Sequence, residues 1–125
     1  MENLILFTKG FILFYLIFMS VLLIHEAIHL LFIRKLGKKI LSMKFNLFGA
    51  SVTYLNDNKY LHIFIISVAP NIILPISGGI LLSYDISIYW NAFAFICILN
   101  LVNLFPFTAD GSIILYSIMK MLKKE

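Results

Sequence analysis

Three long apolar segments dominate the chain and restrict it to a membrane-embedded helical fold. They run from about Gly10 to Ile33, from about Tyr60 to Ser83 and from about Ile86 to Phe107. Each approaches or exceeds the roughly 20 residues that a helix needs to cross a bilayer. With 62% hydrophobic residues, the chain is too apolar for an ordinary soluble domain. We expect a single all-α integral membrane domain over residues 1–125, with about three transmembrane helices.

The N-terminal residues do not resemble a cleaved signal peptide. Glu2 weakens the basic start that such peptides have, and no small-residue cleavage site follows the apolar run. We therefore interpret this segment as a retained anchor. Residues 1–9 either extend the first span or lie at the membrane interface, and the sequence leaves both positions open.

Basic residues gather in two places, at Arg34 to Lys44 and at Lys120 to Lys124. No interleaved aromatic groove accompanies them, so we expect no nucleic-acid partner, and their contact is with the lipid bilayer. The positive-inside rule then places the loop 34–59 and the C-terminus in the cytoplasm. Abundant Ile, Lys, Asn and Phe are typical of an AT-rich bacterial genome, so we expect an integral protein of a bacterial cell membrane.

The segment between the first two spans changes its periodicity. In "ILSMKFNLFGASVTYL", residues 40–55, apolar and polar side chains alternate on both sides of a glycine. Such alternation predicts a short β-hairpin that turns near Gly49 and lies on the membrane surface or dips into it. An amphipathic connector is the alternative. At the other end, residues 111–122 are expected to form a C-terminal amphipathic helix.

The first span contains the motif "HEAIH", residues 25–29. His25 and His29 are four residues apart, so on a helix they share one face. Two imidazoles so placed can bind one Zn²⁺, with Glu26 beside the metal as general base. A glutamate inside a membrane span is costly, and such residues are usually functional. The alternative is that the three side chains only satisfy one another within a helix bundle.

A third metal ligand is available in "NLVNLFPFTADG", residues 100–111. Pro106 should break the helix and free the carbonyl of Val102, so this segment should line a cavity. Asp110 then completes a plausible zinc ligand set, because catalytic zinc commonly has three protein ligands. Gly111 would let the chain turn just after it. Alternatively, Asp110 is only the N-cap of the helix that follows.

The membrane depth of these residues agrees with a shared site. His25 lies nine residues before Arg34, which places it ~14 Å inside the cytoplasmic boundary at 1.5 Å per residue. Asp110 lies near the cytoplasmic end of the third span. We therefore expect an active site toward the cytoplasmic side. His62 is either a further polar partner or an interfacial histidine.

The two motifs, "HEAIH" and "NLFPFTADG", resemble those of the site-2 protease family of intramembrane zinc metalloproteases. As a bare catalytic core, the chain looks closest to the small zincin peptidases of bacteria. The resemblance implies a three-span core with a β-hairpin after the first span, and zinc held by His25, His29 and Asp110. It also implies Glu26 as base and Asn103 as a catalytic residue near the site.

Two features depart from the family pattern. The spacing between Asn103 and Asp110 is one residue shorter than usual, and Asn71 is displaced from the Gly-Pro-x-x-Asn motif of many members. We assign Asn71 no role from the sequence.

These observations predict an intramembrane zinc metalloprotease that cuts membrane-associated proteins or peptides with zinc-activated water. An edge of the hairpin would capture the extended substrate by strand addition. An asparagine, at 71, 100 or 103, would donate to the oxyanion. A zinc-binding membrane scaffold without catalysis and a small transporter subunit are the alternatives. The sequence does not indicate the substrate or the oligomeric state.

Overall fold

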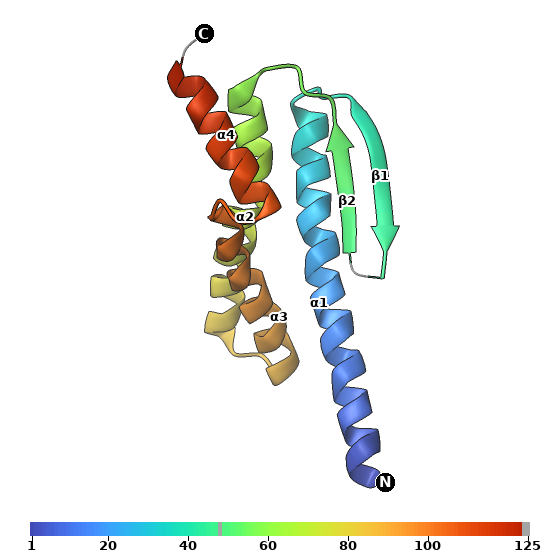
Figure 1. The fold of residues 1–125 in the computed structure, drawn as a ribbon. Coiled ribbons are helices and arrows are strands. Elements are labelled where there is room, and N and C mark those ends of the chain that lie inside the picture. The colour runs from blue at the N-terminus through green and yellow to red at the C-terminus, as the bar shows by residue number, and fades with distance from the viewer. Residues whose placement is uncertain (48, 124–125) are drawn as a thin grey trace.

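The first apolar segment forms one helix, α1, which runs from Glu2 to Lys35 in the computed structural model (Figure 1). The structure describes residues 1–47 and 49–123. Of residues 1–9, which the sequence left open, residues 2–9 belong to this helix. Its 34 residues measure about 51 Å at 1.5 Å per residue, and the helix is apolar enough to cross a bilayer.

Helix α2 runs from Tyr60 to Tyr84, where the second span was predicted, and it is long and apolar enough to cross a membrane. It packs against α1 and against the C-terminal helices, so it is the central helix of the fold. Pro70 and Pro75 lie inside it and are buried. Gly78 allows the close approach of the next helix, because a Cβ there would lie 2.5 Å from the carbonyl oxygen of Ala94.

The third apolar segment, predicted as a span from about Ile86 to Phe107 with a helix break at Pro106, is interrupted there and is not one continuous α-helix. It forms α3 (Ile88–Leu99) and a short 3-10 helix, η1 (Asn100–Leu104). After a break, α4 follows over Ala109–Lys123, at an angle of 41°. Among the described residues two helices are long and apolar enough to cross a membrane, or three if this bent pair is one span.

The break lies where Pro106 predicts it, but the carbonyl of Val102 is not free. It accepts the N–H of Phe105 at 3.1 Å, because the chain has already tightened into 3-10 geometry from Asn100 onward. The carbonyl therefore closes a turn one residue shorter than an α-helical one.

Helix α4 confirms the predicted C-terminal helix, with Gly111, Ile114 and Ser117 on its buried face. The hydroxyl of Thr108 accepts the N–H of Gly111 at 3.0 Å. Thr108 is therefore the N-cap, and Asp110 lies within the first turn, which removes the N-cap alternative for Asp110. Lys124, counted in the basic C-terminal cluster, lies outside the described residues.

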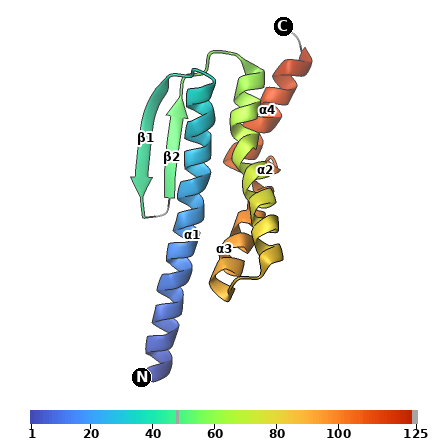
Figure 2. The ribbon, with the colours of Figure 1, turned by 180° about the vertical axis from the view of Figure 1, so that it is seen from behind.

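A β-hairpin joins α1 to α2, and it confirms the predicted hairpin over the amphipathic connector. Strands β1 (Ile40–Asn46) and β2 (Gly49–Tyr54) are antiparallel, with Met43 opposite Val52. The turn lies next to Gly49, as predicted. Figures 1 and 2 show the hairpin running back alongside the C-terminal half of α1, and β2 packs against that helix.

The hairpin extends along α1 over a length comparable to the membrane core. The hydroxyl of Tyr15 donates to the carbonyl of Leu47 at the hairpin tip. Tyr15 lies 20 residues before Lys35, which is about 30 Å along the helix axis. The hairpin therefore lies alongside α1, which is the arrangement expected if it dips into the membrane.

The connections that carry basic residues meet at one end of the molecule. The loop 36–39, the loop 55–59 and the end of α4 lie there, opposite to the N-terminus (Figure 1). Lys38 is buried, with its side chain 1% exposed, and forms an ion pair with Asp57 across the base of the hairpin. The hydrogen bond from Lys38 holds the pKa of Asp57 below its usual value.

Candidate metal centre

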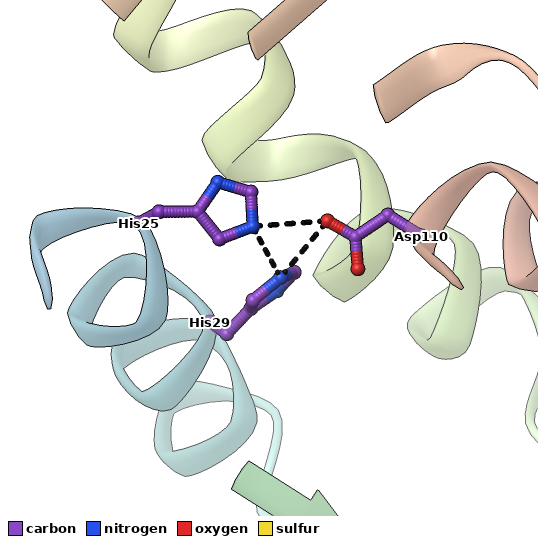
Figure 3. A group of neighbouring side chains, drawn as sticks. All are labelled: His25, His29 and Asp110. Atoms are coloured by element: carbon purple, nitrogen blue, oxygen red, sulfur yellow. Dashed lines mark hydrogen bonds and ion pairs between the residues drawn. The ribbon is translucent and has the colours of Figure 1, made fainter. Parts of the chain in front are cut away.

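Three side chains from two distant parts of the chain converge at one point (Figure 3). His25 and His29 come from successive turns of α1, and Asp110 comes from the first turn of α4. The Nε2 of His25 lies 3.0 Å from Oδ2 of Asp110, and the Nε2 of His29 lies 3.2 Å from it. The two Nε2 atoms are 3.1 Å apart. We call these three residues the ligand trio.

The spacing of the ligand trio fits a zinc ion. Zinc bonds to histidine nitrogen and carboxylate oxygen are about 2.0–2.2 Å long, which separates tetrahedral ligand atoms by about 3.3 Å. The three observed separations, 3.0 to 3.2 Å, are close to this value. His25 and His29 are 6% and 8% exposed. The donor set of two imidazoles and one carboxylate is that of several catalytic zinc sites.

Gly111 lets the broken segment fold tightly enough to bring Asp110 to the histidines. A Cβ at Gly111 would lie 1.7 Å from the carbonyl oxygen of Phe105, a distance too short for any residue that has a side chain. The expected role of this glycine was a turn after the carboxylate. Instead it lies inside α4, and its missing side chain permits the close contact with the preceding loop.

Asn100 orients the imidazole of His25 through a hydrogen bond to Nδ1. Its amide nitrogen donates to the carbonyls of Ile96 and Cys97, both at 3.2 Å. This fixes the orientation of the amide, so Oδ1 faces His25 and accepts its Nδ1–H at 2.7 Å. With the proton on Nδ1, the Nε2 that faces Asp110 has a lone pair for a metal.

His29 is held in the same way by a backbone group. Its Nδ1–H donates to the carbonyl of Ile66 in α2, at 2.8 Å, in a buried contact. Both histidines therefore direct Nε2 toward the centre, as metal-ligating histidines usually do when an outer acceptor binds the other nitrogen.

Asn71 makes the corresponding hydrogen bond to Asp110, the third member of the ligand trio. It is 0% exposed, and its amide nitrogen donates to Oδ2 of Asp110 at 2.9 Å and to the carbonyl of Ser67 at 2.9 Å. The sequence singled out Asn71 without giving it a role. Its signal in the sequence was an amide side chain between two prolines in a largely apolar segment.

Asn103, the predicted catalytic asparagine, connects the two other asparagines. Its amide nitrogen donates to Oδ1 of Asn71 at 3.2 Å and to Oδ1 of Asn100 at 3.4 Å. We call Asn71, Asn100 and Asn103 the asparagine cluster. Each amide nitrogen in it already has two acceptors, so donation to an oxyanion would require one of these bonds to break.

Glu26 lies on the wall of a cavity beside the ligand trio. The cavity has a volume of about 190 Å³ and is also lined by His29, Asp110 and, on β2, Tyr54. Among the described residues, the group able to hold a metal contains the ligand trio, and neither Glu26 nor His62 belongs to it. Glu26 is thus placed next to the metal position with open space before it, and β2 forms one side of that space.

One known protein family matches nearly the whole chain. The family model described as "Putative zincin peptidase" matches residues 6–124. No curated protein and no solved structure matches the chain.

Proposed function

The chain belongs to this family of zincin peptidases, and on that premise we propose that it is an intramembrane zinc metallopeptidase of the site-2 protease type. One observation carries the proposal: the ligand trio converges beside Glu26 within helices of membrane composition. A glutamate and a metal-ligand set are costly in such helices, and ionisable residues found there are usually functional.

The roles of the residues follow from their positions. Zinc, when held by His25, His29 and Asp110, would polarise the scissile carbonyl and make a water molecule more acidic. Glu26 takes a proton from that water and later delivers it to the leaving amine. The asparagine cluster keeps the ligands in place, and this is the role we assign to Asn103.

The substrate class follows from the surroundings of Glu26. This residue also borders a second cavity, of about 110 Å³, between α1 and the hairpin, where the other lining side chains are apolar. Strand β2 pairs only with β1 among the described residues, and its side chains line the site cavity. An extended, apolar segment of a membrane protein or peptide fits this space, with strand addition to β2 as the mode of capture.

The proposal places the reaction inside the bilayer, toward its cytoplasmic side. His25 lies nine residues before Arg34, about 14 Å along α1. The basic residues at the same end of the molecule support a cytoplasmic position for that end.

The test is cleavage of a single-span reporter protein by purified wild type and by Glu26→Gln, with zinc content measured in both. Glutamine keeps the size of the side chain but cannot take the proton, so we expect about a 10²–10⁴-fold loss of rate with zinc retained. Cleavage by Glu26→Gln at the wild-type rate would reject the proteolytic function. Zinc binding without cleavage of any membrane segment by the wild type would favour a metal-binding scaffold.

A further inference from the structure

Pro70 interrupts the backbone hydrogen bonds of α2 at one defined carbonyl. In an α-helix each N–H donates to the carbonyl four residues earlier, and proline has no N–H. The carbonyl of Ile66 therefore receives no helical hydrogen bond from residue 70. Ile66 and Pro70 are both less than 2% exposed, so this carbonyl lies where water cannot replace the missing donor.

The carbonyl of Ile66 is the group that accepts Nδ1–H of His29, at 2.8 Å. A buried carbonyl without a donor is costly, above all at membrane depth, and the imidazole supplies that donor. In return, the bond keeps the proton on Nδ1 and leaves Nε2 for the metal. The proline ring also crowds the carbonyl four residues earlier, which favours its tilt away from the helix axis.

We propose that Pro70 is a positioning residue of the metal centre, which reserves the Ile66 carbonyl for His29 and thereby fixes His29 as an Nε2 ligand. The inference rests on the zinc site of the proposed function. Pro70 lines neither of the two cavities that Glu26 borders, so its role is exerted through a hydrogen bond that the helix does not make.

Pro75 offers a matched comparison within the same helix. It is also buried in α2, and it leaves the carbonyl of Asn71 without its helical donor. Asn71 contacts the ligand trio through its side chain. Alanine at either proline restores an N–H and improves helix propensity, so both substitutions should change the helix similarly. Only the N–H at position 70 would compete for a carbonyl that a metal ligand, His29, already uses.

The experiment compares wild type, Pro70→Ala and Pro75→Ala as purified full-length chains. Zinc affinity is measured by competition with a chelator, and thermal unfolding is measured on the zinc-free proteins. We expect Pro70→Ala to bind zinc roughly 10–100-fold more weakly, the usual effect of losing an outer-shell partner, without lower thermal stability. Pro75→Ala should bind zinc within twofold of wild type. The Nδ1–H proton resonance of His29 in the zinc-loaded protein should move upfield only in Pro70→Ala.

Equal zinc affinity in wild type and Pro70→Ala would overturn the inference and leave the proposed function intact. An equal loss in both proline variants would also overturn it, because the effect would then belong to the helix in general. A wild type that binds no zinc would reject the proposed function itself. If Pro70→Ala does not fold, the imidazole nitrogen resonances of zinc-loaded wild type show which nitrogen of His29 binds zinc. Ligation through Nδ1 would overturn the inference.

Discussion

The Nε2 of His25 lies 3.0 Å from Oδ2 of Asp110, although 85 residues separate the two in the chain. Asp110 reaches this position because the third apolar segment breaks and α4 leaves it at an angle of 41°. The metal centre therefore depends on an irregular piece of backbone as much as on the three ligands.

Asp110→Ala should remove most of the zinc affinity. The loss should exceed about 100-fold, since even outer-shell changes cost 10–100-fold. Metal analysis of purified protein measures it, with Asp85→Ala in the α2–α3 loop as a control that keeps its zinc. Full zinc occupancy in Asp110→Ala would remove Asp110 from the ligand set.

Asn100→Leu should weaken zinc binding by about 10–100-fold, because it removes the acceptor that holds His25. Asn100→Asp keeps an acceptor at this place and should retain the site. Chelator competition measures both affinities. Asn91→Leu, on the neighbouring α3, makes the same change at an asparagine that bonds to Asp85 and serves as the control. A similar loss in Asn91→Leu would show a general effect on folding.

Gly111→Ala should destabilise the protein and displace Asp110. The added Cβ would meet the backbone of Phe105, which cannot yield as a flexible side chain can. We expect a cost of at least about 1–3 kcal/mol, together with weaker zinc binding. Gly79→Ala is the matched control, because a Cβ there meets nothing within 4 Å. Unfolding and zinc titration measure the two effects, and a neutral Gly111→Ala would refute the packing argument.

The orientation predicted from charge can be tested by cysteine labelling in a Cys97→Ser background. Cysteines placed at Lys39 and Lys123 should react with a membrane-impermeant reagent only after the cells are opened. A cysteine at Lys9, near the N-terminal end of α1, should react from outside. The reverse pattern would place the active site toward the outer side of the bilayer.

The ion pair between Lys38 and Asp57 should make the stability of the hairpin base dependent on acid pH. The pKa of Asp57 is lowered in the folded protein, so its contribution is present above the unfolded value of about 3.9 and is lost as pH falls through the folded one. Asp57→Asn should therefore lower the melting temperature at neutral pH and have less effect below about pH 4. A constant difference between wild type and Asp57→Asn across this range would contradict the prediction.

Much of the fold was determined by local pattern. Apolar length fixed α1 and α2, because a helix satisfies its own backbone groups in a bilayer. Alternation fixed the hairpin, because successive side chains of a strand point to opposite faces. The spacing of His25 and His29 placed them on one face of α1 before any tertiary contact was known.

Only the tertiary structure decided the rest of the site. Pro106 predicted a break and Asp110 was a predicted ligand, but the 41° bend that brings Asp110 to the histidines depends on the close contact of Gly111 with Phe105, which no period in the sequence encodes. The acceptor for His29 is a backbone carbonyl, which every residue has. The carbonyl of Ile66 is selected as the acceptor only because α2 packs beside α1. A contact between two helices cannot be read from the sequence pattern of either one.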